Sequence, residues 1–464
     1  MIDKKEPQHP ENDPAQATIL NDDVFGELTE SGPNYRNVVG FVGTVILMMK
    51  TQIGLGVLAI PSALNALGMV PGLLCLLAFA MITTWSGYVV GTFKLQHREV
   101  YSLDDAGAIM LGLPGRVILA ASFCLYYVFN SGSAILGLSV GLNAVSSHAT
   151  CTAVFVAVAA IVGFACSSIR TLGKITWLAW IGLPCILTAV LIVTIAVGVE
   201  DRPAGAPAAT TGPWASNWKA FGNPSFSDGI AAVSNLLFAF SGTPGFFSIV
   251  SEMRDPQQYT AAMVTCQAAV TVVYATIGCV IYYYCGSYVA SPALGSAGGI
   301  IKIISYAFAL PGLMVTMTIV THIPSKFIFV HALRGSRHLT TSTPTHWICW
   351  LSCTFGITLV AWIIASTIPI FDALVSLIGA LLGPLICIIP MAAMWLHDNW
   401  GRGTEGHSRT IRWMLGVMWT LVLIILGTFL IVAGTYGSVD MIMTSYREDG
   451  GSAAFSCADN SNSS

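Results

Sequence analysis

Two short segments rich in glycine and proline lie in the middle of long apolar stretches of this 464-residue chain. The first is Gly54-Leu55-Gly56, followed by Pro61, and the second is Ser241-Gly242-Thr243-Pro244-Gly245. Glycine tolerates non-helical backbone, and proline cannot donate the hydrogen bond that a helix expects of it. Both segments therefore predict breaks in apolar helices, where backbone groups are free to bind a solute.

The chemistry of such a break suits an amino acid. Free N–H groups with positive dipole character lie where the second half of a broken helix begins, and free carbonyl groups lie where the first half ends. We expect the N–H groups around Leu55-Gly56-Val57 to bind a carboxylate. Carbonyl groups near Phe240 and Ser241, with the Thr243 hydroxyl, would bind an ammonium. The second break holds no charged side chain, which favours substrates with neutral side chains.

Lys50 lies four residues before Gly54, inside the same apolar stretch. An ammonium in hydrocarbon is costly and usually functional. The ammonium could fill the space in which a sodium ion would bind, and a desolvated lysine can release its proton, which favours coupling to protons. The alternative is that the side chain extends to the cytoplasmic interface.

Two further groups of polar residues are candidates for the same cavity. Thr316, Thr318, Thr321 and His322 could face the cation position, with His322 as a proton relay; alternatively, the hydroxyls bond to carbonyls of their own helix. Asn130 marks the cavity side of another apolar stretch, and Tyr127 could close over the substrate or simply pack between helices. Ion-coupling candidates are thus Lys50, Thr318, Thr321 and His322.

The composition shows what must position these residues. Hydrophobic residues make up 55% of the chain and charged residues 9%, with a mean hydropathy of +0.73. Soluble domains carry about 25% charged residues, so lipid must cover most of this surface. The net charge of −3 excludes the basic field of a nucleic-acid binder. No metal-binding motif and no cofactor signature appears, and most cysteines lie in apolar runs, where they resemble small buried hydrophobes rather than a disulfide framework.

We expect an all-α polytopic membrane protein with about eleven transmembrane helices. Three segments follow from this: a disordered cytoplasmic N-terminal tail over 1–36, a transmembrane domain over 37–437 and an extracytoplasmic C-terminal tail over 438–464. The predicted spans cover or begin at about 38–67, 71–93, 116, 151, 174, 228–250, 259–289, 300–330, 346, 370 and 411.

Lysine and arginine placement fixes the orientation. With a cytoplasmic N-terminus, 15 of the 20 lysines and arginines lie on the cytoplasmic side and four on the far side, with Lys50 inside a span. An odd number of spans preserves this bias. The two breaks then fall in the first and sixth spans, which correspond if spans one to five and six to ten are inverted repeats. Paired interrupted helices of this kind indicate a transporter site, although glycine and proline are also common in membrane helices generally.

The segments KTQIGLGVLAIPSALNALG, FAFSGTPGFFSIVSEMRDP and YSLDDAGAIMLGLPGR resemble the amino acid/auxin permease family, and most of all its fungal neutral amino-acid permeases. The similarity runs from about Val38 to about Tyr436. It implies the five-plus-five inverted-repeat fold of the bacterial leucine transporter with one extra helix. It also implies proton-driven symport of neutral, often aromatic, amino acids at the plasma membrane, although a vacuolar member of the family would look much the same.

The resemblance also implies where the substrate binds. Lys50 matches the position of a backbone ligand of the sodium site in sodium-coupled relatives of the fold. The matching substrate-binding residues are Thr51, Gln52, Gly54, Leu55, Gly56 and Val57 in the first segment, and Phe240, Ser241, Gly242 and Thr243 in the second.

Other classes of function remain as alternatives. A vacuolar amino-acid exporter of the same family is one. A channel needs a polar stripe or filter, a receptor needs a signalling domain, and a membrane-embedded enzyme needs His, Asp or Cys side chains that converge at mid-membrane depth. The sequence shows none of these features.

Overall fold

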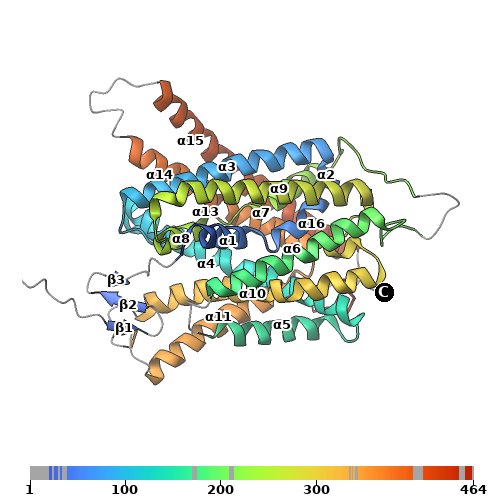
Figure 1. The fold of residues 1–464 in the computed structure, drawn as a ribbon, viewed down its shortest axis with the longest axis horizontal. Helices are drawn as coiled ribbons and strands as arrows, with labels where there is room; N and C mark the ends of the chain where they lie inside the picture. Colours follow the sequence, from blue (N-terminus) through green and yellow to red (C-terminus); the bar gives the residue numbers. More distant parts are fainter. Residues whose placement is uncertain are drawn as a thin grey trace, which may run out of the picture.

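The computed structural model describes residues 20–22, 26–29, 32–33, 39–169, 175–207, 214–333, 336, 338–339, 343–400, 411–448 and 455–461. Long helices run side by side along the long axis of the molecule (Figure 1). The described N-terminal strands lie at one end of these helices, and the described C-terminal end lies at the other.

The helices of the first half begin with a broken pair, α1 (Phe41–Gln52) and α2 (Ile60–Leu67), joined through the short 3-10 helix η1 (Gly56–Ala59). Helix α4 (Leu103–Ser146) is kinked near its start. At Gly112 the backbone has a φ of +66°, which separates a short first helix from the long apolar part of α4. The further helices of this half are α3 (Met69–Gln96), α4 (Leu103–Ser146), α5 (Thr152–Ser167) and α6 (Ile175–Val199).

The second half begins with another interrupted helix, α7 (Phe226–Ala239) and α8 (Phe246–Glu252), with η3 (Thr243–Gly245) between them. The remaining helices are α9 (Tyr259–Cys285), α10 (Gly299–Leu333), α11 (Pro344–Thr367), α12 (Phe371–Leu377), α13 (Gly383–Cys387), α14 (Ile389–Trp400), α15 (Ile411–Phe429) and α16 (Thr435–Glu448). Shorter 3-10 turns are η4 (Pro256–Gln258), η5 (Gly286–Tyr288) and η6 (Ala293–Ser296), and π-helical turns η7 (Ile378–Leu382) and η9 (Leu430–Gly434) interrupt the last two apolar stretches.

The all-α polytopic prediction is confirmed. In the described part of the chain, nine helical stretches are long and apolar enough to cross a membrane, and the broken pair of α1 with η1 and α2 makes a tenth. The remaining predicted span, the fourth, which begins near Cys151, is the 16-residue apolar helix α5. A span needs about 17–25 residues, so α5 falls just short of the usual length.

The N-terminal segment 1–36 contains a feature that the sequence pattern does not predict. Three short strands, β1 (Leu20–Asp22), β2 (Gly26–Thr29) and β3 (Gly32–Pro33), form an antiparallel sheet in the order β1-β2-β3. The other residues of this segment lie outside the described residues.

The C-terminal segment also differs from the expected tail. Helix α16 continues past residue 437 to Glu448. Cys457 forms a disulfide with Cys151 at the start of α5, across 306 residues of sequence. The other ten cysteines are free, as expected for small apolar side chains. The sequence analysis did not predict the bond between Cys151 and Cys457.

Candidate functional site

The first span is broken where its glycines predicted a break. Helix α1 ends at Gln52, Ile53 is extended with ψ of 98°, and regular 3-10 geometry resumes at Gly56. The two halves are bent by 46°. Within the described residues, the N–H groups of Gly54 and Leu55 have no hydrogen-bond partner.

The sixth span is interrupted more gently. Residues 240–242 form a turn in which the N–H groups of Phe240, Ser241 and Gly242 bond to carbonyls two or three residues earlier. The whole stretch Phe226–Glu252 is still long and apolar enough to be one membrane span. The N–H groups in this turn are therefore already used, unlike those of the first break.

The two breaks pack directly against each other, and glycine makes this possible. A Cβ atom on Gly56 would lie 2.5 Å from the Ala239 Cα at the end of α7. A Cβ atom on Gly242 would lie 2.6 Å from the Gln52 Cγ and 2.7 Å from the Thr51 Oγ1. Real Cβ atoms do not approach other atoms this closely, so both positions require glycine for packing.

Two buried tyrosines hold the carbonyl ends of the broken helices. The Tyr274 hydroxyl on α9 donates to the carbonyls of Gln52, at 2.8 Å, and Ala239, at 3.0 Å. The Tyr126 hydroxyl on α4 donates to the Ser241 carbonyl at 2.7 Å. The last carbonyl of α1 and the last carbonyl of α7 are thus tied together through one hydroxyl. Sequence reasoning missed both tyrosines because a single tyrosine in an apolar helix gives no local signal.

A small cavity of about 60 Å³ lies at the breaks. Ten predicted site residues line it: Lys50, Thr51, Gln52, Gly54, Leu55, Gly56, Tyr127, Asn130, Ser241 and Gly242. Its other lining residues are Tyr126, Phe238, Thr316, Ile319, Val320 and Ile323. Thr316, Ile319, Val320 and Ile323 share one face of α10, since they are spaced by three or four residues. This helical spacing from Thr316 is a sequence signal that predicts the other three as lining residues.

Three predicted substrate-binding residues lie outside the lining of this cavity. Val57 is fully buried in the core. Phe240 packs against the Tyr274 ring, with ring centroids 5.2 Å apart. The Thr243 side chain is also buried, and its hydroxyl has no hydrogen-bond partner among the described residues.

Lys50 points between helices α6 and α10. Its ammonium donates to the Thr316 hydroxyl at 2.6 Å and to the Gly312 carbonyl at 3.4 Å. A Cβ atom on Gly182 of α6 would lie 3.1 Å from the Lys50 Cε. The side chain is 5% exposed, and no ion pair within the described chain involves it. The first, fifth and eighth spans therefore enclose this ammonium, and its hydrogen-bond acceptors among the described residues are neutral oxygens.

The other ion-coupling candidates have different neighbours. The Thr318 hydroxyl bonds back to the Met314 carbonyl at 2.9 Å. The Thr321 hydroxyl lies 2.5 Å from the Ser131 hydroxyl on α4.

His322 is likewise turned away from Lys50. Its Nδ1 lies 3.2 Å from the Ser167 carbonyl of α5, and its ring packs edge-on against Trp350 at 5.0 Å. Thr316 is therefore the α10 hydroxyl that the structure places at Lys50.

A second, larger cavity of about 530 Å³ lies at the extracytoplasmic end of the predicted topology. Helices α2, α7, α9, α12 and α16 contribute to it, together with the loop that precedes α7. Asn235 and Asp372 line this cavity and are buried, and one side-chain oxygen of each has no hydrogen-bond partner among the described residues.

Comparison with known proteins places this geometry in a family. The family model described as "Transmembrane amino acid transporter protein" matches residues 38–440. A "Transmembrane transporter" of Gibberella moniliformis is 35% identical over 95% of this chain and 91% of its own length. The "N amino acid transport system protein" of Neurospora crassa is 31% identical over 89% of this chain and 87% of its own length.

A solved structure shares the fold. The crystal structure of MhsT in complex with L-phenylalanine superposes with a TM-score of 0.56 at 15% identity, and covers 86% of this chain and 98% of that one. MhsT has the leucine-transporter fold, which confirms the predicted five-plus-five architecture. The chain therefore belongs to the transmembrane amino acid transporter family, as a multi-pass membrane protein that carries amino acids across a bilayer.

Proposed function

We propose that this transporter is a proton-coupled symporter of neutral amino acids, aromatic ones included, at the plasma membrane. The zwitterion would bind between the breaks of the first and sixth spans. The observation that carries this proposal is the pair of N–H groups at Gly54 and Leu55, which have no hydrogen-bond partner among the described residues and belong to residues that line the cavity beside the second break.

The carboxylate would bind these two N–H groups. Backbone N–H groups at the start of a helix are a common anion site, because the helix dipole adds to the hydrogen bonds. Helix η1 begins at Gly56, directly after the two unpaired groups. Buried backbone donors are rarely left without a partner, so a bound carboxylate explains why this pair is tolerated.

The ammonium would bind oxygens on the other side of the cavity. The Gln52 Oε1 is buried without a hydrogen-bond partner in the described chain, and Gln52 lines the cavity. The Ser241 carbonyl accepts one bond from Tyr126 and retains a second lone pair. The Ser241 carbonyl belongs to the set predicted from sequence, and in this proposal the Gln52 Oε1 takes the place of the Thr243 hydroxyl, because Thr243 does not line the cavity.

The side chain of the substrate would meet apolar and aromatic groups. Phe238, Ile319, Val320 and Ile323 line the cavity together with Tyr126 and Tyr127. Apart from Lys50, the lining residues carry no charge, which favours neutral and hydrophobic substrates. MhsT, which shares the fold, was crystallised with L-phenylalanine.

The cavity must expand to accept such a side chain. Its volume of about 60 Å³ is far below the roughly 300–1,000 Å³ typical of small-molecule pockets. Closure around a substrate and opening to each side in turn are the movements that alternating access requires. We therefore assign the structure to a contracted form of the site.

Proton coupling rests on Lys50. Its ammonium lies where a cation between the first, fifth and eighth spans would lie, and Thr316 and Gly312 supply the oxygens. A fixed ammonium competes with a sodium ion for this position. Protonation would hold α1 against α10, and loss of the proton would weaken that contact.

Transport by purified protein in proteoliposomes tests the proposal. A pH gradient, acidic outside and with choline in place of sodium, should drive accumulation of radiolabelled phenylalanine, and leucine should compete while lysine and glutamate should not. Collapse of accumulation when sodium is absent would refute proton coupling. Absence of counterflow with any neutral amino acid would refute the substrate class. A fluorescent fusion confined to the vacuolar membrane would favour the exporter instead.

A further inference from the structure

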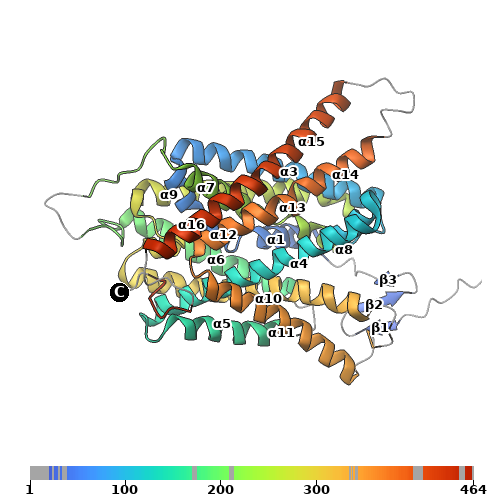
Figure 2. The same cartoon turned by 180° about the vertical axis from the view of Figure 1, so that it is seen from behind.

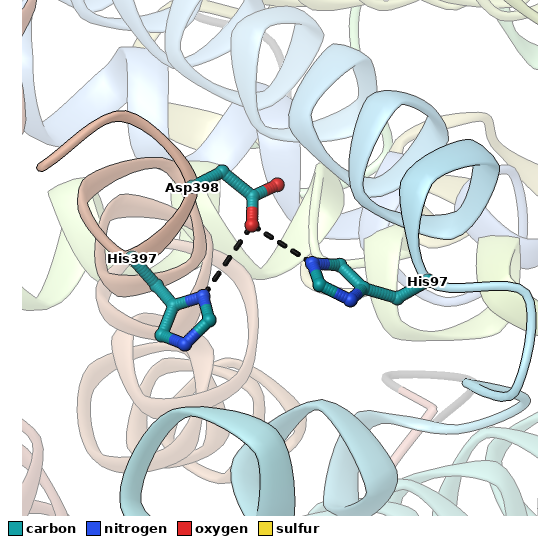
Figure 3. A group of neighbouring side chains, drawn as sticks. All are labelled: His97, His397 and Asp398. Carbon is teal, nitrogen blue, oxygen red and sulfur yellow. Dashed lines mark hydrogen bonds and ion pairs between the residues drawn. The ribbon is translucent and has the colours of Figure 1, made fainter. Parts of the chain in front are cut away.

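Three side chains of metal-ligating type meet at the cytoplasmic end of the molecule, remote from the substrate cavity. His97 follows the last turn of α3, and His397 and Asp398 lie in the last turns of α14 (Figure 3). Both imidazole rings point toward the Asp398 carboxylate. No metal motif in the sequence predicts this group, because 300 residues separate its two parts.

The ligand atoms of these three side chains lie close enough together to share one zinc ion after small movements. The His97 Nε2 lies 2.9 Å from the Asp398 Oδ1, and the His397 Nδ1 lies 3.4 Å from the same oxygen. All three ligand atoms lie within 4.8 Å of one another. Two ligands at about 2.0–2.2 Å from a tetrahedral zinc ion are about 3.3–3.5 Å apart. Small side-chain rotations would therefore bring all three atoms onto one ion.

The surroundings support the same interpretation. A histidine that binds a metal through one nitrogen usually donates its other N–H to a carboxylate or carbonyl. The free nitrogen of His97, Nδ1, lies 3.8 Å from the Glu99 carboxylate. The Phe93 ring stacks on His97 with centroids 4.4 Å apart, which restricts the orientation of the imidazole. The Asp398 side chain is half-buried, with 9% of it exposed, His97 is also half-buried, and His397 is exposed.

We propose that His97, His397 and Asp398 form a regulatory binding site for a divalent transition metal, of which Zn²⁺ is the best fit. Two imidazoles and one carboxylate are a common zinc donor set, and the partial exposure leaves a fourth position for water. The ligands belong to two different spans, so metal binding would join the second span to the tenth.

Such a cross-link would restrain transport. Helix α3 packs against α2, α8 and α9, so it belongs with the halves of the first and sixth spans that carry the breaks. Helix α14 packs against α13, α15 and α4, and it also meets α3 directly, so the contact between α3 and α14 is the boundary between the part that carries the breaks and the tenth and eleventh spans. Zn²⁺ bound between α3 and α14 would hold these two parts together at their cytoplasmic ends and slow the movement that releases substrate.

Zinc binding to the purified full-length protein tests the site directly, without reference to transport. Isothermal titration with ZnCl₂ should show one site per chain, and His97→Gln, His397→Gln and Asp398→Asn should each weaken binding at least tenfold. Asp398→Asn retains a hydrogen-bond acceptor for His97, so it separates loss of metal affinity from loss of the His97 contact. His331→Gln is the matched control, because His331 is also a cytoplasmic histidine, 3.8 Å from the Asp104 carboxylate.

Unchanged zinc affinity in all three ligand variants would overturn the site. In proteoliposomes, Zn²⁺ on the cytoplasmic side should slow counterflow several-fold in the wild-type protein and in His331→Gln, and should have no effect on Asp398→Asn. Equal counterflow with Zn²⁺ and with chelator in the wild-type protein would overturn the restraint. Because the binding assay contains no substrate, its failure is distinguishable from failure of the proposed symport.

Discussion

At the scale of single residues, the glycines of the two breaks serve different purposes. Gly56 and Gly242 allow backbone segments to touch, since a Cβ atom on either would overlap a neighbour at 2.5 to 2.7 Å. Gly54 has more room, because its Cβ atom would lie 3.4 Å from the nearest atom, the Thr316 Oγ1. Substitution at Gly56 would therefore disturb packing as well as binding, whereas substitution at Gly54 tests the cavity itself.

Replacing Gly54 with alanine should raise the KM for the transported amino acid about tenfold with little change in expression. The added methyl group occupies part of the cavity of about 60 Å³ in which the substrate would bind, and a tenfold weaker affinity corresponds to about 1.4 kcal/mol. Gly245→Ala is the control, because its Cβ atom would also have 3.4 Å of room, against Thr51, but Gly245 does not line the cavity. Concentration-dependent uptake measures the effect. A KM for Gly54→Ala equal to that of Gly245→Ala would exclude Gly54 from the binding site.

Lys50→Met should separate exchange from accumulation. Methionine fills similar space without an ammonium, and Thr316 keeps its own bond to the Gly312 carbonyl at 3.0 Å. Counterflow of the radiolabelled amino acid should persist, whereas a pH gradient should no longer drive its accumulation above the outside concentration. Lys302→Met is the matched control, since Lys302 is a buried lysine near the outer end, bonded to the Ser461 carbonyl. Full accumulation by Lys50→Met would show that another group carries the proton.

At the scale of elements, the broken helices depend on helices that are not broken. Tyr274 on α9 and Tyr126 on α4 supply hydroxyls to the carbonyls that the breaks expose. An unpaired carbonyl in a membrane interior is costly, so these hydroxyls allow α1 and α7 to end at mid-depth. Gly379 on η7 and Gly383 on α13 bring the tenth span close to α7, since a Cβ atom on Gly379 would lie 2.0 Å from the Ser234 carbonyl oxygen.

Tyr274→Phe should lower the stability of the protein and weaken transport together. It leaves the Gln52 and Ala239 carbonyls without their shared donor, and an unsatisfied buried group costs about 1–3 kcal/mol. Tyr282→Phe is a control on the same helix, because the Tyr282 hydroxyl accepts a bond from the Lys219 N–H in the outer loop. Apparent melting temperature and uptake would be measured on both. Tyr274→Phe should lose more melting temperature and more uptake than Tyr282→Phe. Equal losses in the two variants would mean that the Tyr274 hydroxyl between Gln52 and Ala239 has no special importance.

The sequence predicted the elements better than it predicted their contacts. Gly54, Gly56 and the second glycine-proline segment mark the breaks, because backbone conformation is a local property. The partners of those breaks come from distant helices: Tyr274 lies 222 residues from Gln52 in sequence. Single tyrosines or threonines in apolar helices carry no local mark of such a contact. The sequence alone therefore does not separate Thr316 from Thr318 and Thr321, because the rotation of α10 decides which hydroxyl faces Lys50.

At the scale of the whole molecule, distant segments meet at both ends of the bundle. At the end that the topology predicts to be cytoplasmic, Val39 pairs with Glu252 and Arg254, so the start of α1 is fixed to the end of α8. At the other end, Cys457 of the C-terminal segment is bonded to Cys151. Disulfides form in oxidising compartments, so this bond supports an extracytoplasmic position for the C-terminal segment. Neither contact is visible in the sequence, because each joins residues more than two hundred positions apart.

Cys457→Ser should reduce stability without abolishing transport. Removal of a disulfide that closes a long loop costs about 2–4 kcal/mol, and neither cysteine lines the substrate cavity. Cys349→Ser, at a free cysteine, should leave the melting temperature unchanged. A membrane-impermeant reductant applied to intact cells should make Cys457 available to a thiol label. No labelling from outside would place the C-terminal segment on the cytoplasmic side and would contradict the odd number of spans.

We expect the outer cavity of about 530 Å³ to be the entrance to the contracted substrate site. Helix α2, the second half of the first span, lines this cavity, so labelling of α2 tests the expectation. Ala66 in α2 lines this cavity, so a membrane-impermeant thiol reagent should modify Ala66→Cys from outside. The wild-type protein is the control, because labelling of its own free cysteines gives the background signal. Binding of an amino acid between the breaks would draw α2 against α7 and close the cavity, because Gly56 already touches Ala239 at the hinge. Saturating phenylalanine should therefore slow labelling several-fold, and lysine should not. Equal labelling rates with and without phenylalanine would mean that α2 does not move with the substrate, and the path through this cavity would have to be abandoned.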